Sequence, residues 1–201
     1  MPRDPLRRPR LALATGAGWQ SRRQIPMTHN LPETDDLARR IEDAFSSCPR
    51  PDPDDMVEPD DGSPVAHELR RAFTGMTWRE APFQTLVYWG DVIDCFSARA
   101  WRYYLPAFLI ATLRTQDPPL VDAMLETLTP LATDRGLTRF NERLALLGQE
   151  QREVIRDFIH QVWPLIHKED DQGSPDCRAF WNDLVTIPNG IAAKPPPAEG
   201  A

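Results

Sequence analysis

Two carboxylates, Asp91 and Asp94, lie three residues apart and directly follow the aromatic residues Tyr88 and Trp89. On a helix, this spacing places both carboxylates on one face. A carboxylate pair beside aromatic rings can serve as general acid and base when burial separates the two pKa values. Helix-surface or capping carboxylates are the simpler interpretation, because no other chemical group in the sequence converges on them.

Metal-binding patterns are weak in this sequence. His160 and His167 are seven residues apart and precede the acidic residues 169–171, but Pro164 interrupts the helical register between them. The acidic stretch that opens at Asp52 lacks the glycine that an EF-hand loop needs at its sixth position. The chain also contains no GxSxG, HExxH, CxxC or Walker pattern. We therefore expect no metal site and no cofactor, and these observations weigh against an enzyme.

Aromatic side chains suggest a different activity. The tryptophans of the chain are first of all candidates for the core, but tryptophan is also enriched among interface residues that contribute most to binding. Our candidates for an interaction surface or a pocket are Trp78, Tyr88, Trp89, Asp91, Asp94, Trp101 and Tyr104.

The spacing of apolar residues predicts helices along most of the chain, and no run alternates with period two for long enough to indicate a strand. We expect an all-α fold, an irregular bundle of about seven helices. Ser63 and Ser97 are expected N-caps, and the proline-rich stretch 49–62 with its six carboxylates predicts a solvated linker. The expected helical segments are 33–47, 63–73, 82–96 with an interruption near Gly90, 99–113, 118–128, 137–148, 148–163 and 176–185.

The segment 99–113 is apolar on all sides, which is typical of a buried helix. Its uncharged run, Tyr103 to Leu113, is eleven residues long, whereas a membrane span needs about 20. Pro106 has no N–H and would clash with the carbonyl of Arg102, at a cost of about 3 kcal/mol. We therefore predict a central buried helix that is broken at Pro106, a break that could open a pocket.

The two ends of the chain differ in composition from the middle. We expect a domain over residues 33–186, a basic Pro/Arg-rich tail over 1–32 that is disordered or precedes a start at Met27, and a Pro-rich disordered tail over 187–201. The chain carries −7 and residues 1–26 carry +5, so the other residues carry −12. This acidity disfavours nucleic acid and suits a basic protein partner. An arginine arm for nucleic acid and an export signal are the alternatives for residues 1–26.

Three cysteines without a pairing pattern argue against a disulfide framework, so we expect a reducing, cytoplasmic location. Because the longest uncharged apolar run is too short to span a bilayer, we also expect no membrane anchor.

Three segments, taken together, resemble a known family: TWREAP (77–82), WRYYLPAFL (101–109) and LLGQEQREVIRDFI (146–159). They are similar to blocks of an uncharacterised bacterial all-α family, a domain of unknown function, and the resemblance covers about residues 34–164. In that family Thr-Pro often precedes Glu-Gln-Arg, where this chain has Gly148-Gln149. The resemblance implies a compact bacterial domain. It implies no reaction, cofactor or catalytic residue.

These observations favour a non-enzymatic protein that binds another protein, for example in an immunity or antitoxin-like role against a basic toxin. The alternative is a small-ligand-binding protein or an enzyme that uses a pocket near Pro106 with Asp91, Asp94 or Tyr104 at its edge.

Overall fold

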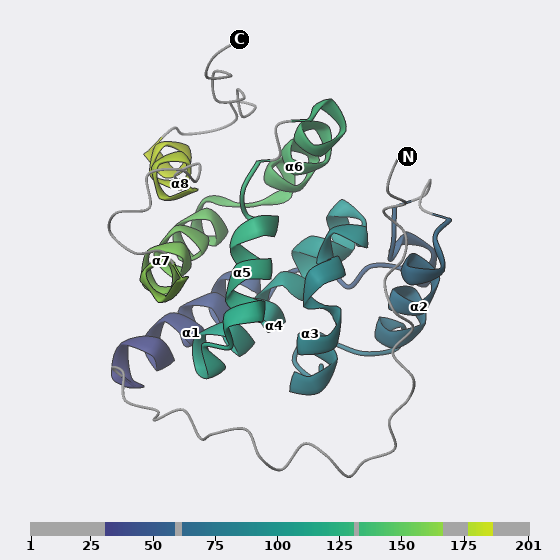
Figure 1. Cartoon of the computed structure of the whole chain (residues 1–201), viewed down its shortest axis with the longest axis horizontal. Helices are drawn as coiled ribbons and strands as arrows, with labels where there is room; N and C mark the ends of the chain where they lie inside the picture. The colour runs from purple at the N-terminus through teal and green to yellow at the C-terminus, as the bar shows by residue number, and fades with distance from the viewer. Residues whose placement is uncertain (1–30, 59–61, 131–132, 167–176, 187–201) are drawn as a thin grey trace, which may run out of the picture. The chain divides into compact units, whose positions relative to one another are not determined.

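The computed structural model describes residues 31–58, 62–130, 133–166 and 177–186. Our expectations for residues 1–30, for residues 187–201 and for His167 lie outside these residues. Within them the chain forms α-helices and 3-10 helices but no strand (Figure 1), which confirms the predicted all-α irregular bundle. The helices are α1 (Leu31–Phe45), η1 (Pro53–Asp55), α2 (Pro64–Phe73), α3 (Phe83–Trp89), η2 (Gly90–Cys95), α4 (Ala98–Thr115), α5 (Pro118–Thr127), α6 (Asp134–Leu146), α7 (Gln149–Ile166) and α8 (Cys177–Thr186).

Helix α4 is the centre of the bundle and contacts α3, α5, α6 and α7 (Figure 1). The Ser97 hydroxyl caps its first turn by accepting a hydrogen bond from the Ala100 amide at 3.1 Å, as predicted. Every residue from Tyr103 to Leu113 is buried, so the expected burial of this segment is confirmed. None of the described helices is both long and apolar enough to cross a membrane.

The predicted break at Pro106 is wrong. Helix α4 continues through Pro106 for its full 18 residues. The proline still leaves the Arg102 carbonyl without its usual helical donor, at a cost of about 3 kcal/mol. Burial of one large apolar side chain contributes about 1.5–3 kcal/mol, and α4 buries several, so packing offsets the missing bond. A pocket opened by a helix break is therefore absent from this helix.

The linker prediction for residues 49–62 also needs correction. Met56 and Val57 are each only 2% exposed, and Val57 forms an isolated antiparallel bridge with Phe96. Ser97 fastens this segment, because its hydroxyl donates to the Asp55 carbonyl at 2.6 Å and its amide donates to the Met56 carbonyl at 3.2 Å. Two apolar residues among many carboxylates are too short a pattern for periodicity to detect.

Two smaller differences concern helix ends and faces. Helix α6 begins at Asp134, ahead of Gly136, because the Thr133 hydroxyl accepts a hydrogen bond from the Gly136 amide at 3.2 Å. In α2, Ala66 is buried and Val65 is 41% exposed, so Val65 does not lie on the buried face of the helix. The helix predicted over residues 148–163 is confirmed as α7, which buries Val154, Ile155, Phe158, Ile159 and Val162.

Candidate functional site

Asp91 and Asp94 do not share an environment. Asp91 is exposed and forms no hydrogen bond or ion pair with the described residues, whereas Asp94 is half-buried and bonded to other elements. Val92 between them is not helical (φ −126°, ψ 15°), so the three-residue spacing no longer defines one helical face. Gly90 brings this segment close to α5, because a Cβ there would lie 3.0 Å from Leu120 Cδ1. The predicted acid/base pair therefore lacks support from the geometry.

Asp94 is instead the acceptor at the centre of a polar network. Its Oδ1 accepts hydrogen bonds from Arg143 Nη1 at 2.5 Å and from the Thr127 hydroxyl at 2.6 Å. Arg143 Nη2 donates to the Asp94 main-chain carbonyl at 2.9 Å and lies 3.4 Å from the Phe96 carbonyl oxygen. The Arg143 side chain is only 5% exposed, against 45% for Asp94. The network therefore fixes a buried cation from α6 at the end of η2.

Trp101 extends this network into the core. It is 1% exposed, and its indole N–H donates to the Thr127 hydroxyl at 3.2 Å. The Arg143 guanidinium lies 5.3 Å from the centroid of its ring, within cation–π range. Trp101, predicted as core first, thus packs in the core and links α4 to α5 and α6.

A cavity of about 190 Å³ adjoins the network between α5 and α6. Its polar lining includes Asp94 of η2, Glu126 of α5 and three arginines of α6, Arg135, Arg139 and Arg143. The four-residue spacing of the arginines places them along one helical face. This spacing is visible in the sequence, and our sequence analysis missed it.

A second hollow, of about 370 Å³, lies between α3 and α4, and we call it the α3–α4 groove. Ala107 and Ala111, one turn apart on α4, contribute small side chains to it. Its apolar lining also includes Trp78, Ala81, Phe83, Leu86 and Ile110. Phe83 is 40% exposed, although it is a large apolar residue. Trp78 is thus one predicted residue that lines an accessible apolar hollow.

The turn before α3 positions Trp78. The Thr77 amide and hydroxyl donate to Glu80 Oε2 at 3.1 Å and 2.8 Å. These two bonds hold the pKa of Glu80 below its usual value, and the bond from the hydroxyl has the larger effect. Thr77 and Glu80 therefore close a turn, and α3 starts after Pro82, close to the predicted start of this helix at residue 82. The Arg79 guanidinium lies 4.1 Å from the centroid of the Trp78 ring.

The remaining aromatic candidates lie in different places. The Tyr104 hydroxyl lies 2.8 Å from the Met76 carbonyl oxygen and 3.0 Å from that of Phe73, and burial raises the pKa of Tyr104 to about 12. It is a core residue that lines a further surface hollow. Tyr88 is 72% exposed, and its ring packs edge-on against half-buried Trp89 at 4.9 Å between centroids. The seven predicted residues are therefore spread over several surfaces.

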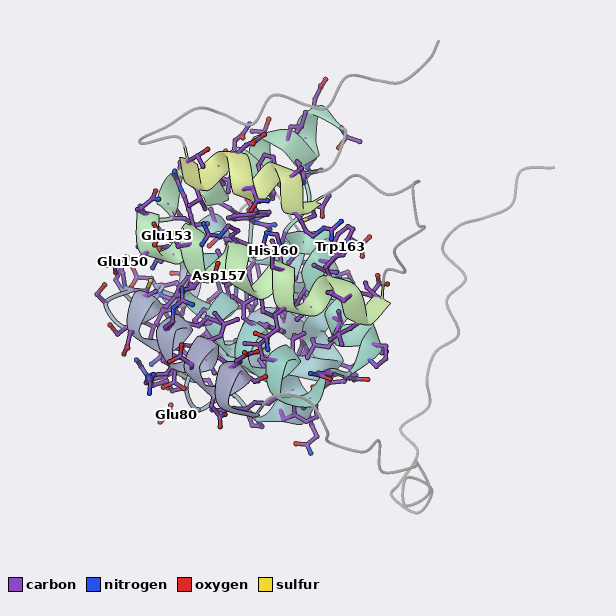
Figure 2. All side chains as sticks on the ribbon, turned by 90° about the vertical axis from the view of Figure 1, so that its left-hand side faces the viewer. Glu80, Glu150, Glu153, Asp157, His160 and Trp163 are labelled. Atoms are coloured by element: carbon purple, nitrogen blue, oxygen red, sulfur yellow. The ribbon has the colours of Figure 1, made fainter. Side chains whose placement is uncertain are left out.

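His160 lies on the outer side of α7, between Asp157 and Trp163 (Figure 2). Its Nε2 is 2.9 Å from Asn182 Oδ1 of α8. Among the described residues, no group of three or more His, Cys, Asp or Glu side chains is placed to hold a metal ion.

One buried polar residue escaped the sequence analysis. Gln151, 3% exposed, accepts hydrogen bonds at Oε1 from Arg102 Nε and the Gly148 amide, both at 3.1 Å. Its Nε2 donates to the Ala44 carbonyl at 3.0 Å. It thus joins α1, α4 and α7, and its position one turn before Val154 and Ile155 on the apolar face of α7 is the signal that could have found it.

The fold and these surfaces define an all-α domain with an apolar groove on one surface and a charged cavity on another. Residues 33–184 match the model of a family described as a family of unknown function, DUF6714. The chain belongs to this family, which confirms the expected membership of a family of unknown function. No curated protein and no solved structure matches the chain.

Proposed function

We propose that this domain binds another protein and that the α3–α4 groove receives apolar side chains of the partner. The observation that carries this proposal is the accessible apolar lining, in which Phe83 stays 40% exposed beside Trp78, Leu86 and Ile110. A concave surface with a mainly apolar lining is typical of binding sites. The volume of about 370 Å³ also falls at the lower end of the range for binding pockets, about 300–1,000 Å³.

The shape of the groove and the net charge of the chain outside residues 1–26 favour a particular kind of partner. Two alanines one turn apart leave room for large side chains, as in complexes where an amphipathic helix inserts apolar residues into a groove. The net charge of −12 outside residues 1–26 favours a basic partner, because opposite charges steer association. A basic toxin neutralised by this domain is one such partner, which keeps the immunity or antitoxin-like role within the proposal.

An enzyme that uses Asp91 and Asp94 has less support. Asp94 Oδ1 already accepts two short hydrogen bonds, and Asp91 lies on the surface without a partner among the described residues. A general acid/base pair needs both groups within reach of one reacting atom.

The test compares Phe83→Asp with Val65→Asp in the full chain. The two residues are matched, since they are 40% and 41% exposed and both lie in the first turn of a helix, where an aspartate is tolerated. Only Phe83 lines the groove. Partners are captured from a bacterial lysate at low salt with each protein, and the Kd of every purified partner is then measured by calorimetry.

We expect Phe83→Asp to weaken binding of the partner at least about tenfold, the effect of losing an interface residue worth about 1.4 kcal/mol or more, while Val65→Asp leaves the affinity unchanged. Added salt should weaken binding further. Circular dichroism of both variants confirms that they fold. Equal affinity of the two variants for the same partner contradicts the proposal, as does a wild-type protein that captures no specific partner.

A further inference from the structure

The cavity between α5 and α6 is separate from the α3–α4 groove, and its chemistry is different. It has about half the groove's volume, about 190 Å³ against 370 Å³, and charged side chains line it. Such a volume is below the range of drug-sized ligands, about 300–1,000 Å³. The cavity therefore suits a molecule with few heavy atoms.

The cationic side of the cavity has one arginine without a partner. Arg143 is held by Asp94, whereas half-buried Arg139 forms no hydrogen bond or ion pair within the described part of the chain. An arginine guanidinium presents its donors in a planar fork that fits a carboxylate. Arg139 is thus the group best placed to receive an anionic oxygen pair.

Carboxylate oxygens also line the cavity. Asp94 Oδ1 takes both hydrogen bonds of the network, and its Oδ2 accepts none from the described residues, although the side chain is 45% exposed. Glu126 also lines the cavity, is exposed, and forms no ion pair with Arg139 or any other described residue. Unpaired positive and negative groups therefore lie around one small volume.

Arg143 adds a fixed positive charge to the lining of the same cavity. It is 4% exposed, and its Nη1 and Nη2 donate to the Asp94 side chain and main-chain carbonyl. Its Nη donors are therefore already in use within the domain, whereas Arg139 keeps its donors for a ligand.

We propose that this cavity binds a small zwitterion, a molecule with one carboxylate and one ammonium group such as a small α-amino acid. Arg139 holds the carboxylate, Asp94 Oδ2 and Glu126 hold the ammonium group, and the ring of Phe140 contacts the aliphatic part. A phosphate dianion leaves the two carboxylates without a cationic group of the ligand, and a simple amine leaves Arg139 unpaired. The inference does not depend on the proposed protein partner.

The experiment titrates the full chain with glycine, L-alanine and L-serine by calorimetry and by amide chemical shifts. Acetate and methylammonium serve as half-ligands, and inorganic phosphate serves as a second anion. We expect at least one amino acid to bind at least tenfold more tightly than either half-ligand or phosphate. Three results would each overturn the proposal. No amino acid binds at concentrations up to about 10 mM, acetate binds as tightly as the best amino acid, or phosphate binds as tightly as the best amino acid.

Variants locate the binding. Arg139→Gln should weaken the amino acid at least tenfold without changing Tm, because Arg139 has no partner within the described residues. Arg71→Gln on α2 is the control, since it makes the same charge change on an exposed residue outside the cavity. Glu126→Gln is a second cavity variant and should also weaken binding about tenfold. Equal binding by Arg139→Gln and Arg71→Gln places the ligand elsewhere and refutes the assignment.

Discussion

Replacing Asp94 by alanine should destabilise the domain, whereas the same change at Asp91 should not. The two substitutions remove the same charge three residues apart, so they differ only in what each carboxylate contacts. Asp94→Ala leaves Arg143 without its partner at 2.5 Å and the Thr127 hydroxyl without its acceptor at 2.6 Å. Asp91→Ala removes an exposed side chain without a partner among the described residues.

The magnitude follows from the burial of the two partners. Removing one member of a buried ion pair costs about 3–5 kcal/mol, because the other charge stays buried. Asp94 is 45% exposed, so water reaches the site after the substitution, and Arg143 keeps the main-chain carbonyl of residue 94. We therefore expect a loss of about 2–3 kcal/mol for Asp94→Ala, against less than about 0.5 kcal/mol for Asp91→Ala.

Urea unfolding followed by circular dichroism measures both values, with equal m-values as the check that unfolding stays two-state. The double variant Asp94→Ala/Arg143→Met supplies a control, because methionine removes the buried charge and keeps most of the apolar volume. It should be more stable than the sum of the single effects by more than about 1 kcal/mol. A loss for Asp94→Ala within about 0.5 kcal/mol of that for Asp91→Ala refutes the assignment of Asp94 as the partner of a buried charge.

Two further predictions concern pH. Burial raises the pKa of Tyr104 from 10.0 to about 12, so the stabilisation by this side chain is complete below pH 10 and is lost as pH rises toward 12. Absorbance titration of the wild type should show one late-ionising tyrosine, and Tyr104→Phe should remove it. A wild-type titration without a late-ionising tyrosine contradicts the prediction. Burial alone would raise the pKa of Asp157, but hydrogen bonds from Arg40 and Arg156 outweigh it and lower the pKa. Its stabilisation is therefore present above about pH 4 and lost as pH falls, so Asp157→Asn should cost about 0.5–1 kcal/mol in urea unfolding at pH 7 and less at pH 3.

Local sequence was sufficient for most of the helices, because their apolar spacing and caps depend on neighbouring residues. Ser63 and Ser97 cap α2 and α4 as expected, and α7 buries its apolar stripe. The break at Pro106 was predicted from local cost alone. Its outcome depends on how much of α4 other helices cover, and that quantity comes from contacts between residues distant in the sequence.

The candidate sites were harder to predict for the same reason. Asp91 and Asp94 look equivalent in the sequence, and only the distant Arg143 and Thr127 distinguish them. Trp78 lines the α3–α4 groove, and the α4 residues that share this lining lie about 30 residues further along the chain. Burial of a charge is thus a property of the fold, whereas the arginine spacing on α6 was a local signal open to detection.

The groove and the cavity share one stretch of chain, since α3 lines the groove and η2 supplies Asp94 to the cavity. Val92 interrupts the helical conformation within this stretch, so each half is positioned by its own contacts. Helix α3 packs on α4, while Asp94 is fixed by Arg143 from α6. A change at Phe83 therefore leaves the bonds of Asp94 in place, and a change at Arg139 leaves the groove intact. Partner binding and zwitterion binding can for this reason be tested independently, and the failure of one proposal does not decide the other.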